Sequence, residues 1–201
     1  MFERDPAIAL FEFESISAGI VAGDAMVKTA PLGAIYAGTV HPGKYLVLVT
    51  GDTASVDEAV RVGDEAESLA DMVFLPDVHP DVASAIAGNA SRAPVGEEAL
   101  GVIETTTAAA AIDAADAGAK AADIDVAAIR LADGLGGKGY VLFSGVVAEV
   151  EAALAAGVER VEGHGTLVRS DLIAQLHEEM AENLRAELRF LSRVSAPTRG
   201  E

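Results

Sequence analysis

The sequence contains no cysteine and no tryptophan, and aromatic residues make up only 4% of its 201 residues. Without cysteine the chain cannot form disulfides, thiolate zinc sites, a catalytic thiol or a Cys-ligated iron–sulfur cluster. Because 51% of the residues are nevertheless hydrophobic, we expect a packed core built mainly from Ala, Val, Leu and Ile. The absence of cysteine is also compatible with a reducing cytosol.

Basic residues are scarce as well, with 14 Lys and Arg against 32 Asp and Glu and a formal net charge of -18. This balance argues against nucleic acid and against anionic membranes as partners, because both require a basic face. No stretch approaches the roughly 18 uninterrupted apolar residues of a membrane span. The first apolar run contains Glu12 and Glu14, unlike a signal peptide, so we expect a cytoplasmic protein.

The chain repeats itself, which is the first feature to establish in any sequence. Charged and glycine residues recur in the same order, 92 residues apart in the early part of each copy and 94 residues apart later. The matches include Glu12 with Glu104, Asp24 with Asp116, Lys28 with Lys120, Lys44 with Lys138 and Gly51 with Gly145. We predict two domains, 7–91 and 98–195, joined by a glycine- and proline-containing linker at 88–96.

Both copies show the same alternation of strand and helix patterns. We predict strands at 7–13, 33–40, 44–50 and 72–76, and again at 100–105, 125–132, 138–144 and 166–169. The predicted helices span 17–30, 53–68, 108–121 and 147–161, with Ser17 and Thr107 as caps. The order β-α-β-β-α-β predicts an α+β protein of two tandem ferredoxin-like domains, each with helices on one sheet face.

Only the second copy is expected to continue into a long helix, at 172–194, with an apolar stripe that includes Leu176, Met180 and Leu184. Such a stripe can pack on its own domain or on a neighbouring subunit.

A glycine-rich segment, 134–139, matches the spacing G-x-G-x-x-G of dinucleotide-binding proteins. That motif requires a following helix, whereas 140–144 has the pattern of a strand, so we interpret the segment as a hairpin loop. Its counterpart in the first copy contains His41. A loop histidine is usually solvated, but three copies around an axis would form a ring able to bind a metal or gain charge below about pH 6.5.

Catalytic patterns are weak. His177 lacks the second histidine of H-E-x-x-H, because Ala181 stands in its place. The recurring Glu12 and Glu104 are more typical of structural hydrogen bonding than of an acid–base pair. Lys28 and Lys120 lie in the last turns of their helices, where they would stabilise the C-terminus or contact a neighbouring molecule.

Several motifs resemble one family. They are 8–12, 23–28, 41–44 and 75–80 in the first copy and 99–105 and 115–121 in the second. These segments are similar to bacterial microcompartment shell proteins of the tandem-domain class, most closely the non-permuted propanediol-utilisation trimer type. The resemblance implies a structural protein, not an enzyme, whose pseudohexameric trimers tile with hexameric and other shell proteins. It also implies a central pore for small polar metabolites and a location in the microcompartment shell.

The resemblance assigns residues to these roles. The implied pore lining is Val40, His41, Pro42, Gly43, Asp133, Gly134, Leu135, Gly136 and Gly137. The implied tile-edge residues are Lys28, Lys120, His79 and Arg169, the last two being placed after the final strand of each copy. His41 stands where some members carry a cluster-binding cysteine, so the one cofactor left open is a metal on the three-fold axis.

Two alternatives remain at this point: a metal- or small-molecule-binding sensor made of two ferredoxin-like repeats, and an enzyme with its site between them. Glycine amides in the pore would favour anions, whereas Asp133 would favour cations, so the sign of the pore field stays open.

Overall fold

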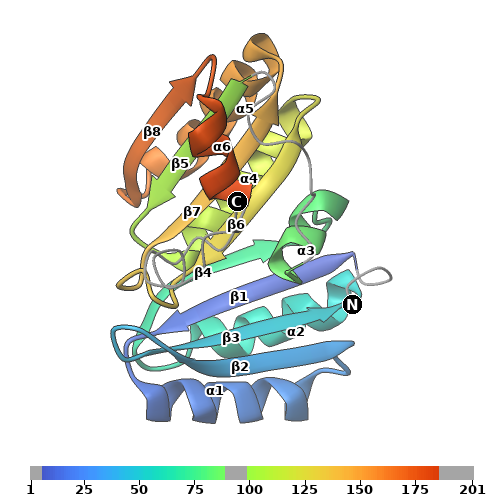
Figure 1. Cartoon of the computed structure of the whole chain (residues 1–201). Coiled ribbons are helices and arrows are strands. Elements are labelled where there is room, and N and C mark those ends of the chain that lie inside the picture. Colours follow the sequence, from blue (N-terminus) through green and yellow to red (C-terminus); the bar gives the residue numbers. More distant parts are fainter. Residues whose placement is uncertain (1–5, 89–98, 186–201) are drawn as a thin grey trace, which may run out of the picture.

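Two four-stranded antiparallel sheets form the framework of the chain, one in each repeat (Figure 1). The computed structural model describes residues 6–88 and 99–185. The strand order is β2-β3-β1-β4 in the first sheet and β6-β7-β5-β8 in the second. The two orders are the same when the second repeat is counted from its own first strand, so the predicted duplication and α+β class are confirmed.

Within the described residues, each repeat contains four strands and three helices in the same sequence order. The first repeat consists of β1 (Ala7–Phe13), α1 (Ile16–Thr29), β2 (Ala34–Val40), β3 (Lys44–Gly51), α2 (Thr53–Asp64), β4 (Leu69–Leu75) and α3 (Pro80–Ile86). The second consists of β5 (Ala99–Thr105), α4 (Ala108–Ala121), β6 (Asp125–Leu131), β7 (Gly139–Gly145), α5 (Val147–Glu162), β8 (Leu167–Ile173) and α6 (Glu178–Arg185).

Local chemistry explains where the first helix of each repeat begins. Thr107 caps α4 as predicted, because its hydroxyl accepts a hydrogen bond from the Ala110 backbone amide at 3.2 Å. The predicted cap Ser17 is wrong, since Ser15 occupies the equivalent position and accepts from the Ala18 amide at 3.3 Å. The first helix therefore begins at Ile16, one residue earlier than predicted.

Small residues bring two helices of each repeat close to one face of its sheet. A Cβ added to Gly63 of α2 would lie 2.2 Å from Phe11, and one added to Gly157 of α5 would lie 2.6 Å from Ile103. These two glycines occupy matching positions, so both repeats use the same close helix–sheet approach. The cores beneath the helices include Phe11, Phe13 and Val47 in the first repeat and Ile103, Val141 and Phe143 in the second.

The prediction of helices on only one sheet face is wrong. In the first repeat α3 lies on the opposite face, where Val82 joins Ile8 and Leu10 in one apolar cluster. In the second repeat α6 does the same, with Ala181 packed near Leu100. The first copy therefore has a terminal helix of its own, which the sequence analysis did not identify.

The C-terminal helix also differs from its prediction. Leu172 belongs to β8, and the helix begins only at Glu178. Residues beyond 185, including the rest of the predicted stripe and the domain end at 195, lie outside the described part of the chain, as do 89–98 of the linker region. Leu176 and Leu184 contact the sheet of their own domain. This agrees with the first of the two alternatives, in which the stripe packs on its own domain.

Among the described residues, no helix has the length and apolar character needed to cross a bilayer.

Candidate functional site: an internal joint and two adjoining hairpins

The two repeats meet in a joint between the first sheet and α4. Apolar residues of β1 and β3 share a core cluster with Ala108, Ala109 and Ile112 of α4. α3 adds to the joint, because it contacts both β6 and α4. The second repeat is therefore seated on the face of the first sheet that α1 and α2 leave uncovered (Figure 1).

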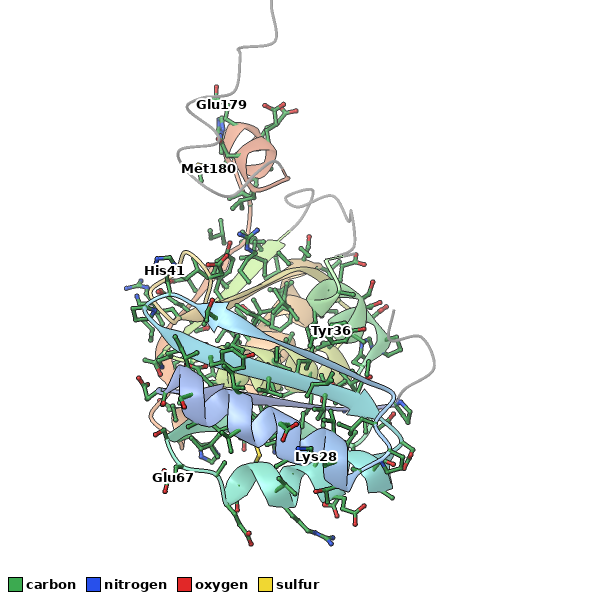
Figure 2. The ribbon with its side chains drawn as sticks, turned by 90° about the horizontal axis from the view of Figure 1, so that it is seen from below. Lys28, Tyr36, His41, Glu67, Glu179 and Met180 are labelled. Carbon is green, nitrogen blue, oxygen red and sulfur yellow. The ribbon has the colours of Figure 1, made fainter. Side chains whose placement is uncertain are left out.

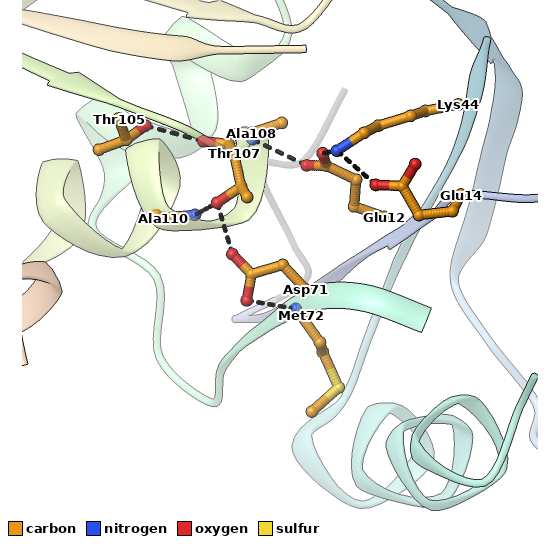
Figure 3. Close-up of polar contacts among 9 residues, drawn as sticks. All are labelled: Glu12, Glu14, Lys44, Asp71, Met72, Thr105, Thr107, Ala108 and Ala110. Atoms are coloured by element: carbon orange, nitrogen blue, oxygen red, sulfur yellow. Dashed lines mark hydrogen bonds and ion pairs between the residues drawn. The ribbon is translucent and has the colours of Figure 1, made fainter. Parts of the chain in front are cut away.

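A buried carboxylate lies at the first turn of α4. Glu12 is fully buried and accepts a hydrogen bond from the Ala108 amide at 2.8 Å. Its other oxygen lies 2.7 Å from the Lys44 ammonium, which is also 2.9 Å from Glu14 (Figure 3). Burial lowers the pKa of Lys44, but the hydrogen bonds and charges of Glu12 and Glu14 outweigh burial and raise it. Glu12 therefore has a structural role.

A second carboxylate from the first repeat binds the cap of the same helix. The Thr107 hydroxyl, which caps α4, donates a hydrogen bond to Asp71 of β4. The other Asp71 oxygen accepts from the Met72 amide at 2.8 Å (Figure 3). Two carboxylates from one repeat thus face the N-terminus of a helix in the other, where the helix dipole favours negative charge.

The C-terminal half of α4 is fixed to the segment that follows β4. Asp116 accepts a hydrogen bond from the His79 amide at 2.8 Å. Lys120 pairs with Asp116 at 2.6 Å and also donates to the Asp77 carbonyl. Two of the predicted edge residues, Lys120 and His79, therefore belong to the internal joint, although the Lys120 side chain remains 43% exposed.

The matching helix of the first repeat, α1, is left uncovered by the described parts of the chain. Ile20 of α1 is 53% exposed, whereas its equivalent Ile112 in α4 is 0% exposed. The same contrast holds along the helix: α1 exposes Ile16, Ile20 and Val27, while α4 buries Ala108, Ile112 and Ala119. A groove beside this face is lined by Gly19, Ile20, Gly23, Asp24, Val27, Ile35, Ala37 and Tyr45. The first repeat therefore presents the surface that the second repeat buries.

The second sheet presents the complementary surface. Glu104 and Lys138 lie 2.7 Å apart, at the positions of Glu12 and Lys44, but both are partly exposed. Arg169 stands in β8 opposite Glu104, as Asp71 stands opposite Glu12. The polar half of a joint is thus present on this sheet. α6 packs near Leu100 on the same face, but no described helix takes the place that α4 has on the first sheet.

Strand register corrects the predicted position of Arg169. Leu75 pairs with Ile8 and Ile173 with Leu100, which makes β4 and β8 equivalent along their whole length. The residue that matches His79 is therefore His177, while Arg169 lies inside β8. The two histidines also share a role, because the Nδ1 atom of each accepts from a backbone amide at 3.3 Å. The shared pairs Val78-His79 and Leu176-His177 were the sequence signal for this match.

The predicted pore loops come together within one chain. A Cβ added to Gly137 would lie 3.3 Å from Pro42 and 3.8 Å from the His41 carbonyl. The His41 Nδ1 atom is 3.7 Å from an Asp133 oxygen. Gly134, Gly136 and Gly137 all have positive φ, and the segment links two paired strands, so the hairpin interpretation is confirmed. Figure 2 shows His41 and Lys28 toward opposite ends of the first repeat.

Comparison with known proteins identifies the class. The BMC domain model matches residues 7–78 and again 99–176, so the chain belongs to the BMC-domain family, with two domains in tandem. It is 36% identical to the bacterial microcompartment shell protein PduT of Citrobacter freundii over 176 residues, covering 87% of this chain and 95% of that protein. The chain is a microcompartment shell protein, and the predicted family is confirmed.

Solved structures agree with this assignment. A microcompartment protein from Desulfitobacterium hafniense is 41% identical, with a TM-score of 0.75 over 88% of this chain and 98% of that one. The fused permuted hexameric shell protein MSM0275 of the RMM microcompartment is 22% identical, with a TM-score of 0.53 over 78% of this chain and 84% of that one. The second likeness supports the fold alone.

Proposed function

We propose that three copies of this chain close into a six-domain ring that serves as a tile of the shell. In each contact between chains, α1 of one copy packs on the second sheet of the next, as α4 packs on the first sheet within the chain. The observation that carries this proposal is the exposure of Ile20 at the position where α4 buries Ile112. Because each chain carries two BMC domains, a ring of six such domains requires three chains.

Polar groups support the same arrangement. Glu104 is in place to accept from the Ile16 amide of a neighbour, as Glu12 accepts from Ala108. Asp24 would accept from the amide of His177, as Asp116 accepts from that of His79. Lys28 would then donate to a carbonyl of the neighbour, as Lys120 donates to Asp77. Each contact between chains thereby repeats a contact inside the chain.

The adjoining hairpins would surround the centre of this ring. Three copies would place three pairs of His41 and Asp133 around the axis, with the glycine amides of 134–137 between them. Such an opening suits small polar metabolites, because backbone amides and titratable side chains both line it. We propose passage of metabolites, with no chemical step, as the role of this opening.

The outer ends of α1 and α4 would form the tile edge toward hexameric and other shell proteins. Lys120 keeps part of its surface exposed while it serves the internal joint, so the same side chain can also reach a neighbouring tile. We therefore retain Lys28, Lys120 and His79 as edge residues and assign Arg169 to the contact between chains.

The ring is tested by comparing Ile20→Glu with Val146→Glu. Val146 is another exposed aliphatic residue, but it caps α5, which packs on the Ile103 face of the second sheet and not on the face that carries Glu104, so it is the matched control. Native mass spectrometry should give the parent and Val146→Glu a mass three times that of the 20.5 kDa chain. Ile20→Glu should be monomeric, because it places a charge in an apolar contact. A monomeric parent, or a trimeric Ile20→Glu, would refute the ring.

We further propose that the ring of His41 side chains binds a divalent transition metal. Imidazole nitrogen with carboxylate oxygen is a suitable donor set for Zn²⁺, and each His41 has Asp133 beside it. Within residues 6–88 and 99–185 of a single chain no group of three such ligands is present, so the site requires the trimer. Zn²⁺ should raise the melting temperature of the parent but not of His41→Ala. An equal response from both proteins would remove the proposal.

A further inference from the structure

The two joint surfaces match closely except at one charged position. Glu12 corresponds to Glu104 and Lys44 to Lys138, but Asp71 corresponds to Arg169. The next residue on the same face changes as well, from the buried Val73 to Asp171. The sheet that would receive a neighbouring chain therefore carries a positive group where the internal joint carries a negative one.

Arg169 cannot repeat the contact that Asp71 makes. Asp71 accepts a hydrogen bond from the hydroxyl of Thr107, whereas a guanidinium has donors only. In the free chain Arg169 pairs with Asp171 at 2.5 Å and 2.7 Å, which raises the pKa of Arg169 and lowers that of Asp171. Both groups therefore stay charged, and the Arg169 side chain is 72% exposed.

The helix that would meet Arg169 differs in the complementary sense. α1 is preceded by Glu14 and Ser15, whereas α4 is preceded by Thr106 and Thr107. Glu14 is therefore an acidic group with no counterpart in the second repeat. A carboxylate at position 169 would repel Glu14, while an arginine can pair with it and also donate to the Ser15 hydroxyl oxygen.

We propose that Arg169 determines which helix the second sheet accepts, by pairing with Glu14 of a second copy of this chain. The proposal rests on the ring described above, and it names the charged contact that distinguishes the joint between chains from the joint within the chain. The other charged groups around this contact are Glu12 and Lys44 beside Glu14, and Glu104, Lys138 and Asp171 beside Arg169.

The pairing determines which helix packs on which sheet. The internal joint joins a sheet bearing Asp71 to a helix preceded by threonines, and the external joint joins a sheet bearing Arg169 to a helix preceded by Glu14. An exchange of partners between the two joints would place Asp71 beside Glu14 and leave Arg169 without a carboxylate from the helix. Like charges at such contacts suppress wrong partners.

Charge reversal tests this pairing in the full-length chain. Arg169→Glu and Glu14→Arg should each raise the trimer dissociation constant by about tenfold in roughly 0.1 M NaCl, and the double variant should return to within about threefold of the parent. The effect of each single reversal should shrink in about 1 M NaCl, because salt screens exposed charges. Analytical ultracentrifugation over a concentration series provides the constants.

The matched control is Arg61→Glu, which reverses an exposed charge on α2 whose ion-pair partner within the described residues is Asp57 of the same helix. It should leave the trimer unchanged. When Glu14 is replaced, Lys44 still has its ion pair with Glu12. Circular dichroism of each variant checks that the fold persists. If the parent is trimeric but the single reversals dissociate no more readily, or the double variant fails to recover, the pairing is wrong and the ring stands. A monomeric parent would overturn both.

Discussion

Lys44 and Lys138 occupy equivalent positions in the two repeats, and each lies 2.7 Å from a glutamate, yet their side chains are 15% and 50% exposed. The difference arises because α4 covers Lys44 and Glu12, whereas nothing in the described residues of the same chain covers Lys138 and Glu104 to that degree. One ion pair is therefore buried within the folded chain, and the other lies on the surface that we propose a neighbouring chain covers.

This contrast predicts unequal costs for two matched substitutions. In an Ile20→Glu background, intended to hold the chain as a monomer, Lys44→Ala should lower the free energy of unfolding by about 3 kcal/mol, because Glu12 would remain buried without its counter-ion. Lys138→Ala should cost less than about 1 kcal/mol, since an exposed ion pair contributes little. Urea denaturation measures both values. Equal losses would show that burial does not distinguish the two pairs.

The Lys44 contribution should also depend on pH. Because its pKa is raised above the ordinary 10.5 in the folded chain, Lys44 binds its proton more tightly when folded. The stabilisation is therefore complete below that value and is lost as pH rises through the higher folded pKa. The difference in unfolding free energy between the parent and Lys44→Met should be constant from neutral pH and narrow above pH 10.5. A difference that widens there would contradict the assigned contacts.

The sequence was sufficient to predict the two repeats and most of their strands and helices. Recurring charged residues and glycines aligned the copies, because those residue types are held by specific contacts: Glu12 by a helix N-terminus, and Gly63 by the ring of Phe11. The apolar positions carried less information, since Ala and Val recur throughout the chain.

The end of each repeat was harder to predict, for a physical reason. The two copies are 98 residues apart at His79 and His177, because α5 has 16 residues whereas α2 has 12. On the sheet face that carries Glu12 in β1 and Glu104 in β5, the residues of β4 and β8 also differ, with Asp71 and Val73 in the first repeat and Arg169 and Asp171 in the second. Asp71 faces a helix of the same chain and Arg169 is assigned to a proposed neighbour, so the pattern of one copy does not predict the residues of the other at these positions.

The glycine on α5 gives a test of the shared packing. Gly157→Ala should destabilise the chain by about 2 kcal/mol, because its Cβ would approach Ile103 at 2.6 Å and the Ala114 carbonyl at 2.9 Å. Gly163, at the end of the same helix, has open space around it and a φ of -62°, so Gly163→Ala should be neutral or slightly stabilising. Thermal unfolding of both variants checks this, and a loss at Gly163 alone would contradict the packing.

The tile edge gives the last prediction. Replacing both Lys28 and Lys120 with alanine should leave the trimer formed, because the apolar contacts of α1 and α4 persist. The double variant should, however, need a protein concentration about tenfold higher or more before the trimers assemble edge to edge into extended layers. Lys120→Ala alone should also lower the melting temperature, since Lys120 donates to the Asp77 carbonyl across the internal joint, whereas Lys28 pairs only with Asp24 in the geometry of the single chain. Negative-stain microscopy detects the layers of tiles, and native mass spectrometry detects the trimers. Arg61→Ala is the control for the loss of an exposed cation. If layers of tiles form at the parent concentration, neither lysine belongs to the tile edge. Loss of the trimer in the double variant would contradict the expectation that the apolar contacts alone hold the ring together.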